Sequence, residues 1–164
     1  MPRLTRGRVW IFGDDINTDL ILPGAVFLAP VAEQARHCFS ANRPGWVDQV
    51  TAGDLVVAGK NFAVGSARPI GPIFVQLKLG GIVAESFNGL GLRNCVNYGV
   101  NALPCPGVTA AFDEGDLAEV DWARGQIKNL SRRTTVNGMP LPQPLLDIVD
   151  SGGVLEVLKR EGFL

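Results

Sequence analysis

The sequence predicts a mixed α/β fold in which a partly parallel sheet is flanked by helices, and three observations support this class. Between residues 55 and 98 the pattern runs strand, loop, helix, strand, helix, which implies crossovers between parallel strands. Glycine (20) and proline (11) make up nearly a fifth of the 164 residues, which favours short strands joined by tight turns. From residue 117 the pattern becomes that of a hairpin. The length fits one domain, so we expect a single domain over residues 1–164.

The first half of the chain begins with two apolar runs, each followed by a polar loop. Residues 8–12 form a run closed by a glycine and two aspartates, which is typical of a buried strand that delivers the loop at residues 14–19. A weaker pattern at residues 30–39 predicts a short helix. Residues 55–58, Leu-Val-Val-Ala, predict a second buried strand that leads into the loop at residues 59–67.

The clearest helical pattern follows that second loop. Apolar residues at i, i+3, i+4 and i+7, counted from Ile70, predict a helix over residues 70–77 that ends at the glycine pair 80–81. Ser66 lies just upstream of its first turn, where a serine commonly serves as an N-cap.

The remaining elements are shorter, and turn residues separate them. A third buried strand and a helix come first, then the hairpin with an additional strand, and finally two short helices split by Gly152 and Gly153. Their expected ranges are 81–84 and 90–98, then 117–121, 126–130 and 134–136, and last 144–149 and 154–159.

Composition excludes several functional classes. Hydrophobic residues make up 46% and mean hydropathy is +0.18, too apolar for a disordered chain, yet no apolar run is long enough to cross a membrane. Fifteen basic and sixteen acidic residues leave a charge of −1, so neither nucleic acid nor a membrane is an expected partner. The first ten residues contain no signal-peptide pattern, and we expect a cytoplasmic protein.

Three cysteines, Cys38, Cys95 and Cys105, form no CxxC pair and share the chain with a single histidine, His37. This pattern supports neither a zinc site nor a disulfide framework, so we expect no metal on this chain. The cysteines are interpreted as small buried apolar residues, which fits a reducing compartment.

The most informative segment is residues 59–68. A glycine-interrupted loop that enters a helix would gather backbone N–H groups and the positive helix end around one small volume. Arg68 adds a cation with bidentate geometry for a carboxylate, and Ser66 lies beside it. The segment therefore predicts an acid-binding site with a candidate reactive hydroxyl, the alternative being that Ser66 is only an N-cap.

Residues 13–23 carry three aspartates within six positions but lack the ligand alternation of an EF-hand. A cation site is therefore not expected here. The alternative to a cation site is a loop whose carboxylates accept hydrogen bonds from backbone N–H groups in Asx-turns.

Four segments in the same order and near the same spacing resemble the small subunits of 3-isopropylmalate dehydratases, the swivelling-domain subunits of the aconitase superfamily. They are GDDINTDLILPG (13–24), GKNFAVGSAR (59–68), AESFNGLGLRNCVNYGV (84–100) and LPQPLLDIVDSGGVLEVLK (141–159). The resemblance implies a swivelling β/β/α fold and a hydro-lyase that acts on a small hydroxy-diacid, here 3-isopropylmalate/2-isopropylmalate isomerisation in leucine biosynthesis. It also implies a large-subunit partner that binds a [4Fe–4S] cluster, with none bound by this chain.

The resemblance further implies roles for individual residues. Ser66 matches the family serine that acts as an alkoxide base, Arg68 matches the arginine that binds a substrate carboxylate, and Asp19 matches the catalytic-shell aspartate of a TD pair. Ala67 stands where the family usually has a second serine and is expected to contact the substrate, and Pro69 and Ile70 replace the usual Glu-His. The missing hydroxyl removes a hydrogen bond worth ~1–3 kcal/mol to a charged acceptor.

Substrate choice in the family comes largely from the loop after the TD pair, here residues 24–30. We expect Val26, Phe27 and Leu28 to contact the substrate, and the loop has no arginine for a third carboxylate. An apolar loop favours an alkyl substituent over a citrate-like acid, because an unpaired buried carboxylate is unfavourable. Two alternatives stay open: a paralogous dehydratase for dimethylmalate or methylmalate, and a non-catalytic binding protein that retains the fold.

Overall fold

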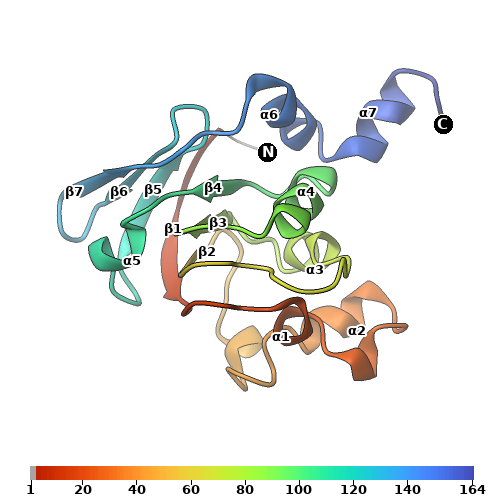
Figure 1. The fold of residues 1–164 in the computed structure, drawn as a ribbon, viewed down its shortest axis with the longest axis horizontal. Helices are drawn as coiled ribbons and strands as arrows, with labels where there is room; N and C mark the ends of the chain where they lie inside the picture. The colour runs from red at the N-terminus through yellow and green to blue at the C-terminus, as the bar shows by residue number, and fades with distance from the viewer. Residues whose placement is uncertain (1–2) are drawn as a thin grey trace.

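The computed structural model describes residues 3–164 and is built on a seven-stranded sheet in the order β4-β3-β2-β1-β5-β6-β7 (Figure 1). The strands are β1 Leu4–Ile11, β2 Leu55–Ala58, β3 Gly81–Ala84, β4 Ala102–Pro104, β5 Leu117–Asp121, β6 Gln126–Asn129 and β7 Thr134–Asn137. Strands β1 to β4 pair in parallel, whereas β5 to β7 pair antiparallel. The predicted mixed, partly parallel sheet is therefore confirmed.

Strand β1 joins the two halves of the sheet. Its first residues, Leu4 to Arg8, pair antiparallel with β5, and Val9 to Ile11 pair in parallel with β2. All residues of β2 and β3 are buried, which explains why they are continuous apolar runs in the sequence.

Seven α-helices and two 3-10 turns complete the described chain. They are α1 Thr18–Ile21, η1 Gly24–Val26, α2 Val31–Arg36, η2 Trp46–Asp48, α3 Gly71–Gln76, α4 Gly89–Asn97, α5 Val108–Ala111, α6 Gln143–Asp150 and α7 Val154–Arg160. Figure 1 shows α1 to α4 on the right of the parallel strands and β5 to β7 on the left. Among residues 3–164 no helix is long and apolar enough to cross a membrane.

The sheet separates two hydrophobic clusters because successive side chains of a strand point to opposite faces. Trp10 and Val56 pack with the residues of α2, α3 and α4, whereas Val9 and Val57 pack with α5, β5 and β6. The helices beside the parallel strands are thereby held against one face, and the loops at the strand ends rest on this core.

The helix predicted over residues 70–77 is shorter, and it begins at Gly71. Its N-cap is Ile70, with no side-chain cap, so the interpretation of Ser66 as an N-cap is wrong. The intervening segment turns tightly, because the N–H of Arg68 bonds to the carbonyl of Ser66 and the N–H of Ile70 bonds to that of Arg68, at 2.8 and 2.9 Å.

Candidate active site

Two loops that leave neighbouring parallel strands run side by side. One joins β1 to α1 and the other follows β2, and the N–H of Thr18 bonds to the carbonyl of Val64 at 2.9 Å. A second bond runs from the N–H of Ala63 to the carbonyl of Ile16 at 2.8 Å. The carboxyl ends of parallel strands are the edge where α/β proteins bind ligands. The fold therefore brings the segments at residues 13–23 and 59–68 together at the edge of the sheet where ligands commonly bind.

Both loops use left-handed backbone at non-glycine residues. Asp15, Asn61 and Ala63 have φ values of 54°, 58° and 61°. The amide of Asn61 donates to Asp15 Oδ1 at 2.9 Å, which ties the two bends together. At Gly59 a Cβ would lie 2.0 Å from Asp14 Oδ1, so the loops approach too closely for any other residue. Such backbone conformations persist only where the surrounding structure enforces them, which is common at functional sites.

The TD pair divides its contacts between the two candidate residues. Thr18 Oγ1 lies 3.2 Å from Ser66 Oγ, and Asp19 Oδ1 lies 2.7 Å from Arg68 Nη2. The pair is placed by Asn17, whose side chain caps α1. The contacts of the TD pair therefore bring together three of the predicted site residues, Asp19, Ser66 and Arg68.

The guanidinium of Arg68 is held on three sides. Besides the ion pair to Asp19, its Nη1 donates to the carbonyl of Leu22, and its Cζ lies 5.7 Å from the Phe27 ring centroid. The Arg68 side chain is 22% exposed, whereas that of Asp19 is 65% exposed. A guanidinium has five N–H donors, so about three remain for an incoming carboxylate.

The predicted substrate loop is only partly organised around Arg68. Phe27 stacks against the guanidinium, and Val26 packs on the core beneath. Leu28 is 93% exposed, and Ala67 is also exposed at the surface of the second loop. Phe27 thus presents an apolar ring beside the cation, whereas Leu28 extends into solvent.

The structure corrects one expectation about the site and adds one residue to it. The N-terminus of α3 does not supply donors to Ser66: the helix begins five residues later, and the N–H of Gly71 bonds to Asn94 Oδ1 at 2.7 Å. Thr18, whose hydroxyl contacts Ser66, was not among the site residues predicted from the sequence. The available signal was its place directly before Asp19 at the start of a capped helix.

The three cysteines are fully buried, as expected. Burial raises the pKa of the Cys95 thiol to about 12, and burial together with the charge of Glu85 raises that of Cys105 to about 11. Thiols that stay protonated are poor metal ligands. Over residues 3–164 no group of three or more His, Cys, Asp and Glu side chains is placed to hold a metal ion.

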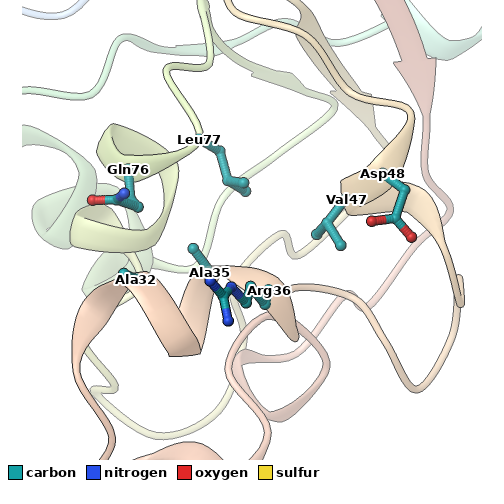
Figure 2. A pocket seen from close by; sticks show the side chains of 7 residues that line it. All are labelled: Ala32, Ala35, Arg36, Val47, Asp48, Gln76 and Leu77. Atoms are coloured by element: carbon teal, nitrogen blue, oxygen red, sulfur yellow. The ribbon is translucent and has the colours of Figure 1, made fainter.

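A cavity of about 270 Å³ lies elsewhere, between α2, η2 and α3 (Figure 2). Its lining is Ala32, Ala35, Arg36, Val47, Asp48, Gln76 and Leu77, which includes none of the candidate site residues. Ser66 is instead exposed on the surface of this chain. A water-excluded site around Ser66 would therefore need a second surface to cover it.

Comparison with known proteins identifies the family. No family model matches the chain. The protein named 3-isopropylmalate dehydratase small subunit 1 of Methanopyrus kandleri is 40% identical over 166 residues, covering 99% of this chain and 96% of that protein. The isopropylmalate/citramalate isomerase small subunit of Methanocaldococcus jannaschii is 36% identical over 165 residues, with coverage of 98% and 97%.

A crystal structure of 3-isopropylmalate dehydratase (LeuD) from Methanocaldococcus jannaschii superposes with a TM-score of 0.90 at 28% identity. The match covers 98% of this chain and 96% of that one, so the folds agree throughout. These likenesses confirm the resemblance carried by the four sequence motifs, and the chain belongs to the family of 3-isopropylmalate dehydratase small subunits.

Proposed function

We propose that this chain is the small subunit of a hydro-lyase that interconverts 3-isopropylmalate and 2-isopropylmalate in leucine biosynthesis. The observation that carries the proposal is the pairing of Ser66 with Thr18 and of Arg68 with Asp19, at the carboxyl edge of β1 and β2. One loop thereby carries a hydroxyl and a guanidinium two residues apart, and in this proposal one small diacid contacts both. The names of the relatives support the same reaction.

In this proposal Arg68 binds one substrate carboxylate through the donors that Asp19 and Leu22 leave free. Ser66 then removes the proton from the adjacent carbon. A serine alkoxide is unstable in water, so the step requires a dry site with positive charge and hydrogen-bond donors near Oγ. The exposure of Ser66 on the isolated chain implies that a large subunit supplies the cover.

The residues of this chain do not fit an iron–sulfur cluster, because the three cysteines are buried and no ligand group forms within residues 3–164. The [4Fe–4S] cluster is therefore assigned to the large subunit, which supplies Lewis-acid chemistry at the departing hydroxyl. The free cysteines also support a cytoplasmic location, since such thiols persist in a reducing compartment.

Reconstitution with a cognate large subunit tests the proposal. We expect the isolated chain to be colourless and inactive. The reconstituted pair should convert 3-isopropylmalate through its alkene, and the ultraviolet absorbance of the alkene measures the conversion. Ser66→Ala should abolish turnover and leave the complex assembled on size-exclusion chromatography. Ser151→Ala, at the end of α6, is the matched control and should stay active. Full activity of Ser66→Ala would exclude the assignment of the base.

A second candidate is an isomerase of a smaller alkyl malate, methylmalate or dimethylmalate. It is favoured by Ala67, which replaces the usual second serine beside the carboxylate-binding arginine. One relative is also named for both isopropylmalate and citramalate. A panel of alkyl malates separates the candidates: turnover of the smaller acids without isopropylmalate turnover supports this one. Ligand binding without any turnover supports the non-catalytic alternative.

A further inference from the structure

The Thr18 hydroxyl has a role that the motif match does not assign. Thr18 is 2% exposed, and its backbone is fixed on both sides, with the N–H bonded to Val64 and the carbonyl accepting from the Leu22 N–H at 2.8 Å. Within residues 3–164 its hydroxyl has one hydrogen-bond partner, Ser66 Oγ at 3.2 Å. A buried hydroxyl with a single partner can donate its proton in a hydrogen bond to that partner only.

We infer that Thr18 is a positioning residue that donates its hydroxyl proton to Ser66 Oγ when Ser66 acts as the base, an inference that rests on the proposed function. A hydrogen bond to an anionic oxygen is about twice as strong as one to a neutral hydroxyl. The contact is therefore strongest while Ser66 Oγ is ionised, before it takes the substrate proton, and it favours that ionised form. Thr18 keeps its own proton throughout, and the proton taken from the substrate carbon ends on Ser66 Oγ.

The surroundings of Thr18 hold the donor in place before the reaction. A β-branched side chain has few χ1 rotamers, so burial leaves the Thr18 hydroxyl little freedom. Gly65 closes over it: a Cβ there would lie 3.3 Å from Thr18 Oγ1, and the φ of 112° also requires glycine. A donor that needs no rearrangement is the kind that stabilises developing charge most effectively.

The neighbouring charged residues do not replace this donor. Asp19 is paired with Arg68, with its Oδ1 2.7 Å from Arg68 Nη2. The N-terminus of α3 lies beyond the turn at residues 68–70 and bonds to Asn94. Within the described part of the chain, Thr18 is consequently the side chain that hydrogen-bonds Ser66 directly.

A reporter thiol tests this inference without substrate, cluster or large subunit. In a Ser66→Cys chain the three native cysteines are at most 1% exposed, so iodoacetamide reports on position 66. We expect Thr18→Val to raise the pKa of the reporter thiol by roughly one unit, seen as an alkylation profile displaced to higher pH. Thr18→Ser should restore most of the original profile. An unchanged profile in Thr18→Val would overturn the inference.

Thr5→Val is the matched control. Thr5 is also buried, and its Oγ1 accepts a hydrogen bond from Trp122 Nε1 at 2.9 Å, between β1 and the end of β5. This change removes a buried threonine hydroxyl of equal size away from Ser66, so the thiol profile should stay where it is. If Thr18→Val melts too early to assay, Thr18→Ala replaces it, because both variants lack the hydroxyl.

The reconstituted enzyme provides the second readout. Thr18→Val should lower kcat about 10–100-fold, as expected for one hydrogen bond to a charged group, with KM changed less than about 2-fold. The ascending limb of its pH profile, which reports the ionisation of the base, should move to higher pH, which a purely structural role would not produce. If Ser66→Ala is inactive while Thr18→Val is normal in both assays, the inference fails and the proposed function stands. If Ser66→Ala is fully active, the proposed base fails, and the thiol profile still decides the hydrogen bond.

Discussion

Asp19 and Arg68 form an ion pair whose two members differ in exposure: the carboxylate lies at the rim and the guanidinium beneath it, with Oδ1 and Nη2 2.7 Å apart. Arg68 is therefore oriented before any ligand arrives. A substrate carboxylate bound to Arg68 as proposed would share the guanidinium with Asp19. The ion pair thus fixes the orientation of the Arg68 guanidinium and limits how many of its N–H groups are free for the proposed substrate carboxylate.

We expect Asp19→Ala to separate activity from stability. The ion pair is largely exposed on the Asp19 side, so its loss should change the free energy of unfolding by less than about 1 kcal/mol. Arg68 loses its orienting partner, so kcat/KM of the reconstituted enzyme should fall about 10-fold or more. Asp19→Asn keeps an acceptor oxygen, so its kcat/KM should lie between those of the wild-type chain and Asp19→Ala. Urea titrations and steady-state kinetics check the result, and wild-type kcat/KM in both variants would contradict it.

Arg68→Lys should weaken substrate binding although charge is kept. A lysine is a point charge and cannot hold the Leu22 carbonyl, Asp19 and a substrate carboxylate in one plane. We expect KM to rise at least ~10-fold, by loss of a bidentate charged contact. Arg124→Lys, in the exposed turn of the β5–β6 hairpin, is the control and should leave KM unchanged. A normal KM in Arg68→Lys would remove Arg68 from the carboxylate site.

Gly91 and Ala63 should show coupled stability. A Cβ on Gly91 would lie 2.4 Å from the Ala63 Cβ, and both residues are buried. Gly91→Ala should therefore destabilise the fold by about 1–3 kcal/mol through overpacking. Adding Ala63→Gly removes the opposing methyl and suits the φ of 61°, so the double variant should recover most of the loss.

The control for this pair is Gly89→Ala, where the space beside the backbone in α4 is open. Gly89→Ala should change the free energy of unfolding little. Tm and urea midpoints are measured for the wild-type chain, Gly91→Ala, Ala63→Gly, the double variant and Gly89→Ala. Additive losses in the double variant would show that the two sites do not share this contact.

Stability should fall at acid pH, in part through Asp54. Burial raises the pKa of this carboxyl, but the Thr51 N–H, the Trp10 indole N–H and the Arg8 guanidinium outweigh burial and hold the pKa below its usual value. Because the folded pKa is depressed, the stabilisation is fully present above the unfolded pKa of about 3.9. It is lost as the pH falls through the folded pKa.

Urea unfolding at several pH values between neutral and about 3 measures this dependence, since that range brackets the unfolded pKa of aspartate. In Asp54→Asn the free energy of unfolding should be lower at neutral pH and should decline less steeply on acidification. Identical slopes for the variant and the wild-type chain would show that Asp54 does not contribute to acid sensitivity.

Strands β2 and β3 could be predicted to the residue because a strand buried on both faces is an uninterrupted apolar run. The shorter elements could not be predicted in this way. α1 is a single turn fixed by the Asn17 cap, and β4 is three residues that become a strand by pairing with β3. The expected extent of α3 was also too long, since the turn at residues 68–70 delays its start.

By itself the sequence determined the order of buried strands, the two polar loops that follow them and the motifs that identify the family. These depend on local composition and spacing, which each segment carries alone. Only the tertiary structure decided that Thr18 meets Ser66 across 48 residues, and that Asp19 turns to Arg68. Such contacts depend on how β1 and β2 align and how their loops bend, and no single segment contains that information.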